Sequence, residues 1–81
     1  MIDSWMWYDA DENSTRSVML DTAAGHLLWY VEAGCACTDA DVVQTIADFI
    51  AQGPAVASLP PDILDEMHAC LRHASLMTSS H

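Results

Sequence analysis

The chain has 81 residues, of which 52% are hydrophobic, so it is long enough for one core and too apolar for a disordered acidic tail. Its charge is strongly negative. It has 12 Asp and Glu residues but only two Arg and no Lys, which gives a formal net charge of −10. Binding to nucleic-acid phosphates or to an anionic membrane depends on Lys and Arg, so both are excluded as the main activity. We expect a single compact domain over residues 1–81 with a frayed tail over residues 76–81.

The sequence has the features of a soluble cytoplasmic protein. Residues 1–5 lack the basic start and apolar run of a signal peptide. No apolar stretch approaches the roughly 18 to 20 residues of a membrane span. The three cysteines cannot all pair within one chain, which favours the reduced thiols of a cytosol.

Three β-strands are expected in the first part of the chain. Residues 3–9 are rich in aromatic side chains between polar ones, and residues 17–21 and 26–32 are short apolar runs. A polar loop follows the first strand, and residues 22–25 form a tight turn between the second and the third. Short connections of this kind favour an antiparallel meander.

Two helices are expected after the strands. The first is predicted to begin at a Thr38 cap and to end at Gly53 and Pro54. Its apolar stripe consists of Val42, Val43, Ile46, Phe49 and Ile50. The polar residues on the opposite side are Asp41, Gln44, Asp48 and Gln52. The second opens at residues 60–62 and buries Ile63, Leu64, Met67, Cys70, Leu71 and Ala74. The predicted fold is α+β, a three-stranded antiparallel meander followed by two helices packed on one face.

This architecture leaves one face of the sheet without a helix. Apolar side chains fall on both parities of the strands: Trp5, Trp7, Leu27, Trp29 and Val31 on one, and Met6, Tyr8, Leu28 and Tyr30 on the other. Two helices cover only one of these faces. The second is therefore solvent-exposed, paired in a dimer, docked on a partner, or covered by the curl of the strands and the chain ends.

A zinc site is one alternative that the residue types allow. Cys35, Cys37, Cys70 and His73 would complete a Cys₃His set, with the last two three apart on a helix. The single residue between Cys35 and Cys37 is not a usual zinc spacing, and Cys70 lies on the apolar stripe. Ordinary thiols are favoured, and no metal or cofactor is expected.

No catalytic signature names a reaction, so we expect a protein that is not an enzyme. Cys37 precedes a predicted helix start, a position that lowers a thiol pKa. Neighbouring acids such as Asp39 and Asp41 act in the opposite direction, because they disfavour a second negative charge. A loop thiol is the better interpretation.

The acids gather in three clusters, and this is the strongest functional signal. The clusters are Asp9, Asp11 and Glu12; Glu32, Asp39 and Asp41; and Asp62, Asp65 and Glu66. With Arg16 and Arg72 as the only Lys or Arg residues, at least ten carboxylates lack a counterion of this kind. Rows of carboxylates imitate nucleic-acid phosphates and steer a protein onto a basic, nucleic-acid-binding surface. The alternative is a solvated acidic surface that serves solubility.

A local resemblance agrees with this interpretation. It rests on Tyr30-Val31-Glu32-Ala33-Gly34, an acidic helix start at Asp39, the pair Leu59-Pro60, and a helix with Asp65-Glu66-Met67-His68-Ala69. Over residues 27–74 this order resembles a family of small acidic phage anti-CRISPR proteins that act on type I-F surveillance complexes. The resemblance implies a DNA-mimicking phage inhibitor in the host cytoplasm, and only Tyr30, Glu32 and Asp39 match position by position.

The leading hypothesis is a non-enzymatic inhibitor or interaction protein that binds a basic, nucleic-acid-binding site on a larger host protein. Its predicted partner-binding residues are Tyr30, Glu32, Asp39, Asp41, Asp9, Asp11 and Glu12. One alternative is an acidic homodimeric subunit whose aromatic sheet face is the interface. A second is a small structural zinc module.

Overall fold

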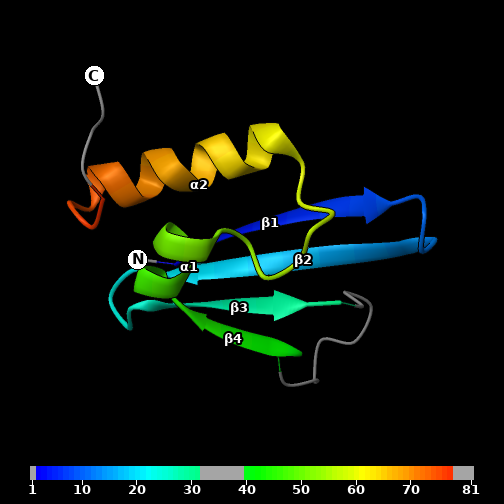
Figure 1. Ribbon diagram of the computed structural model, residues 1–81, viewed down its shortest axis with the longest axis horizontal. Helices are drawn as coiled ribbons and strands as arrows, with labels where there is room; N and C mark the ends of the chain where they lie inside the picture. The colour runs from blue at the N-terminus through cyan, green and yellow to red at the C-terminus, as the bar shows by residue number, and fades with distance from the viewer. Residues whose placement is uncertain (1, 32–39, 78–81) are drawn as a thin grey trace.

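The computed structural model describes residues 2–31 and 40–77, and its centre is a four-stranded antiparallel sheet (Figure 1). The strands β1 (Ile2–Asp9), β2 (Ser14–Asp21), β3 (His26–Tyr30) and β4 (Val42–Thr45) lie side by side in chain order. Two helices, α1 (Ile46–Gln52) and α2 (Pro61–His73), follow them. The predicted α+β class and the antiparallel meander are confirmed, with one more strand than expected.

The tight turn between β2 and β3 forms where its sequence predicts it. Gly25 has a φ of 82°, in the left-handed region that glycine tolerates, and its N–H donates to the Asp21 carbonyl over 2.9 Å. The Asp21 side chain accepts from the Ala24 N–H at 3.0 Å, as Asp commonly does in turns.

The predicted first helix is wrong over Val42–Thr45, which form the edge strand β4. Val42 pairs with Trp29 and Val43 with Leu28, and two consecutive β-branched residues suit a pleated surface. Gln44 was placed on the solvent side of a helix, but it is buried: its Oε1 accepts from Trp29 Nε1 at 3.0 Å. The helix begins only after Thr45, whose hydroxyl accepts from the Asp48 N–H at 3.1 Å. Thr38 lies outside the described residues.

One face of the sheet forms the core with both helices. Trp29 is fully buried there, with its ring centroid 6.4 Å from that of Trp7 in an edge-on arrangement and 6.3 Å from that of Phe49. The buried cluster comprises Trp7, Val18, Leu20, Leu27, Trp29, Ile46, Phe49, Leu59, Met67 and Leu71. The covered face is therefore the one that strand parity gives to Trp7, Leu27 and Trp29, a choice between the two faces that the sequence left open.

The second helix agrees with its predicted start and with its predicted stripe except at Ala74, which is exposed and follows the helix. Pro61 is its first residue, Met67 and Leu71 are buried, and Ile63, Leu64 and Cys70 pack against the core. After it, the Leu76 N–H donates to the Leu71 carbonyl at 2.9 Å and Met77 packs against the core. The remainder of the predicted tail, residues 78–81, lies outside the described residues. Within the described ranges, no helix has the length and apolarity needed to cross a membrane.

Neither of the two described helices packs on the opposite face of the sheet. Met6, Tyr8 and Val43 are 64%, 61% and 64% exposed there, and Met19, Leu28 and Tyr30 are half-buried. In the strand register Met19 lies opposite Leu28, and Leu28 lies opposite Val43. This face is solvent-exposed in the single chain, which is one of the outcomes expected from strand parity.

The burial of Gln44 gives a test of the strand assignment. The variant Gln44→Leu removes the acceptor of the Trp29 N–H and the donor of the 2.9 Å bond to the Gly53 carbonyl. Buried polar groups left without partners should lower the free energy of unfolding by about 1–3 kcal/mol, measured by urea denaturation. The control Gln52→Leu, at an exposed position of α1, should change it little. An unchanged value for Gln44→Leu would contradict the strand.

Candidate functional site

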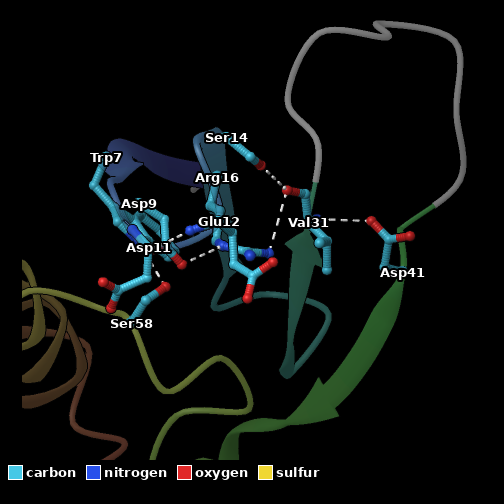
Figure 2. A network of polar contacts seen from close by, with 9 residues as sticks. All are labelled: Trp7, Asp9, Asp11, Glu12, Ser14, Arg16, Val31, Asp41 and Ser58. Atoms are coloured by element: carbon cyan, nitrogen blue, oxygen red, sulfur yellow. Dashed lines mark hydrogen bonds and ion pairs between the residues drawn. The ribbon is translucent and has the colours of Figure 1, made fainter.

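Described members of two of the three acid clusters lie at one end of the sheet. Because β1 and β3 run in the same direction, the turn after Asp9 lies at the same end as Val31 and the start of β4. Figure 2 shows Asp11 and Asp41 on opposite sides of Arg16, which lies between the strand ends. We call Asp11, Glu12 and Asp41 the acidic end. All three residues are exposed.

Arg16 holds this end of the sheet together from the inside. Its Nε donates to Asp9 Oδ2 at 2.9 Å, and its Nη1 donates to the Val31 carbonyl at 3.3 Å. The Ser14 hydroxyl donates to the same carbonyl at 3.1 Å. Arg16 thereby links β1, β2 and the residue that follows β3, and its positive charge is used within the fold.

Asp9 was predicted as a partner-binding residue, but the structure places its carboxylate inside the fold. Its second oxygen, Oδ1, accepts from the N–H groups of Asp11 and Glu12 at 3.1 and 3.3 Å. The Arg16 hydrogen bond is the main cause that holds the pKa of Asp9 below its ordinary value of 3.8. Asp9 is buried, so it positions Asp11 and Glu12 and presents little surface of its own.

Asp41 is held from the other side of Val31. Its Oδ2 accepts from the Val31 N–H at 2.7 Å, and its own N–H donates to the Trp29 carbonyl at 2.9 Å. These two bonds fix the carboxylate at the start of β4 while it stays exposed. Glu32 and Asp39, the other two members of its predicted cluster, lie outside the described residues.

Two tyrosines adjoin the acidic end on the open face of the sheet. Tyr30 is half-buried and lies opposite Ser17 in the register. Tyr8 is 61% exposed, and its hydroxyl donates to Asn13 Oδ1 in the β1–β2 turn. Tyr8 was not among the predicted partner-binding residues, although strand parity already placed it on the same face as Tyr30.

In the described part of the chain, the exposed acids of this end form no ion pair. The ion pair of Asp9 with Arg16 is the only one among the residues that the structure describes. The other arginine, Arg72, lies in the last turn of α2, where a positive charge favours the helix end. The acidic end is therefore an uncompensated negative surface, and such a surface can bind cationic side chains.

The two described members of the zinc alternative line a different part of the molecule. Cys70 and His73 border an open hollow of about 580 Å³, together with Asp3, Thr22, Ala69 and Ala74. Burial raises the pKa of the Cys70 thiol, and the nearby Asp3 carboxylate acts in the same direction. A protonated thiol is a poor nucleophile and a poor metal ligand.

No metal centre is visible in the part of the chain that is described. There, no group of three or more His, Cys, Asp and Glu side chains could hold a metal ion. Cys35 and Cys37, the other two ligands of the predicted set, lie outside that part.

Comparison with known proteins finds no matching family model, curated protein or solved structure. A function for this chain is therefore inferred from its own geometry.

The Asp9–Arg16 pair predicts a particular dependence of stability on pH. Because the folded pKa of Asp9 is below 3.8, the pair stabilises the protein fully above that pH and is lost as pH falls through the folded pKa. Wild type should be more stable than Asp9→Asn at pH 7, and the difference should vanish in acid. Urea unfolding of both proteins across pH measures it, and comparing them cancels the effects of the other acids.

Asp11→Asn is the matched control for that comparison. It also removes one carboxylate, but from an exposed position without an ion-pair partner among the described residues. We expect no stability advantage of wild type over Asp11→Asn at neutral pH. Equal behaviour of the two variants would show that the Asp9–Arg16 pair does not stabilise the fold.

Proposed function

We propose that this protein is a non-enzymatic inhibitor that binds a basic, nucleic-acid-binding surface of a larger protein. The observation that supports this best is the acidic end: Asp11, Glu12 and Asp41 are exposed and uncompensated among the described residues. Arg16, the one cation at this end of the sheet, is buried against Asp9. A partner with Lys and Arg side chains would supply the missing charges.

The acidic end is partly preorganised for such a partner. The backbone of Asp11 and Glu12 is held by Asp9, and the carboxylate of Asp41 is held by the Val31 N–H. Groups that are ordered before binding lose less entropy when they bind, so each contributes more to affinity. The same negative surface would also speed the encounter with a basic partner at low salt.

The family resemblance names the first target to test. Anti-CRISPR proteins of the family that the sequence resembles occupy the basic site where a type I-F surveillance complex recognises target DNA. Of the three positions matched to that family, Tyr30 adjoins the acidic end in the structure. For this chain we therefore propose DNA mimicry at such a site in the host cytoplasm.

A second candidate function is favoured by a separate observation. Met6 and Val43 are 64% exposed on a sheet face that no described element covers, which is the surface that a homodimeric subunit would use. The small size of that face and the formal charge of −10 on each copy favour a different partner over a second copy.

The proposed inhibitor function is tested by neutralising the acidic end without changing its shape. The triple variant Asp11→Asn, Glu12→Gln, Asp41→Asn keeps an acceptor oxygen for the Val31 N–H. Wild type should block binding of labelled target DNA to a type I-F surveillance complex in a gel-shift assay. The variant should be weaker by roughly tenfold or more, about 1.4 kcal/mol, because three charge contacts are lost.

The control removes the same number of charges from α2: Asp62→Asn, Asp65→Asn, Glu66→Gln. These residues are exposed and lie outside the acidic end. The control should inhibit like wild type, and inhibition should weaken as salt rises above about 0.1 M, where the Debye length is about 10 Å. Equal loss in both triple variants would show that total charge, and not the acidic end, carries the activity. No inhibition by wild type would rule out this target.

A further inference from the structure

The open face of the sheet is apolar at its centre, with charged groups beyond it at both ends. We call Met6, Met19, Leu28, Tyr30 and Val43 the open-face patch. In the register, Met19, Leu28 and Val43 form one cross-strand row, and Ser17 lies between Met6 and Tyr30 in the next. The ionisable strand residues of this face other than the tyrosines are Asp21 and His26, which pair at the end away from Asp41.

The size of this face limits what it can bind alone. Four strands at about 4.8 Å spacing are about 19 Å wide, and strands of five and eight residues are about 17 and 27 Å long. The face therefore offers roughly 300 to 500 Å², whereas a stable interface buries about 800 Å² per partner. An interface built on the open-face patch needs additional surface beside it.

The acidic end is the additional surface that adjoins the patch. Tyr8 and Tyr30 lie on the open face at the same end of the sheet as Asp11, Glu12 and Asp41. The two surfaces therefore lie at the same end of the sheet. A second copy of the chain would bring a further formal charge of −10 against these carboxylates, which opposes pairing of two identical faces.

We infer that the open-face patch and the acidic end form one composite docking surface for a protein whose apolar patch is bordered on one side by Lys or Arg. This inference rests on the proposed function. It adds that the partner has an apolar patch beside its basic site, a feature that binding of nucleic acid does not require. Apolar contacts would be made over Met6, Leu28 and Val43, and cationic contacts at Asp11, Glu12 and Asp41. Charge gives the rate of encounter, and the buried apolar contacts slow dissociation.

Two synthetic peptides of equal positive charge test the composite surface. One is an amphipathic Leu–Lys helix, and the other is an oligolysine without apolar residues. Wild type should bind the Leu–Lys peptide at least roughly tenfold more tightly, measured by fluorescence anisotropy, because only that peptide covers the open-face patch. In Met6→Gln/Val43→Thr this preference should disappear, while binding of oligolysine stays unchanged.

The matched control removes two exposed apolar side chains that lie outside the sheet. Ile50 and Leu76 are 40% and 41% exposed, and Ile50→Gln/Leu76→Gln should keep the full preference for the Leu–Lys peptide. Both double variants should keep the urea midpoint of wild type within experimental error, since all four positions are solvent-exposed. A preference that persists in Met6→Gln/Val43→Thr would overturn the composite surface.

Two further measurements separate this inference from the proposed function. If the acidic-end triple variant binds oligolysine as well as wild type does, the proposed function fails, while the preference between the peptides still reports on the patch. Sedimentation of the free protein should show a monomer. A dimer that Met6→Gln/Val43→Thr dissociates would show that a second copy occupies the face, and would overturn the inference.

Discussion

The ion pair between Asp9 and Arg16 is the contact on which the acidic end depends. Both side chains are buried, and an ion pair at such a position is stable only when its remaining hydrogen-bonding groups are also satisfied. They are satisfied here by the Val31 carbonyl and by the N–H groups of the β1–β2 turn. One internal cation thereby joins β1, β2 and the residue that follows β3, and the Asp9 that it holds fixes the backbone of Asp11 and Glu12.

Strand parity and helix stripes could be predicted from the sequence because they are local patterns. Alternation along β1 and β3 places Trp7 and Trp29 on one face and Met6 and Tyr8 on the other, as observed, but it does not tell which of the two faces the helices cover. The strand β4 could not be predicted in this way, because Val42, Val43 and Ile46 also fit a helical stripe. The strand is favoured over a helix by a non-local contact, the hydrogen bond between Trp29 and Gln44 on neighbouring strands.

The candidate site was predictable to the same extent. Clustering of acids in the sequence identifies Asp11, Glu12 and Asp41, but it cannot tell an exposed carboxylate from one turned inward. Asp9 faces inward because it has the strand parity of Trp7, and the pairing of Trp7 with Arg16 brings the guanidinium beside the end of β1. That register depends on tertiary structure, so the role of Asp9 in positioning Asp11 and Glu12 is visible only in the folded chain.

The net charge and the open apolar face constrain each other. A small protein with Met6 and Val43 exposed on one sheet face would tend to associate with itself through that face. A formal charge of −10 on every copy opposes this encounter, while it favours the approach of a basic surface. Self-repulsion lowers the stability of the fold, and the Asp9–Arg16 pair and the single covered face of the sheet offset it. The same charge can therefore keep the open-face patch free of other copies and available to a basic partner.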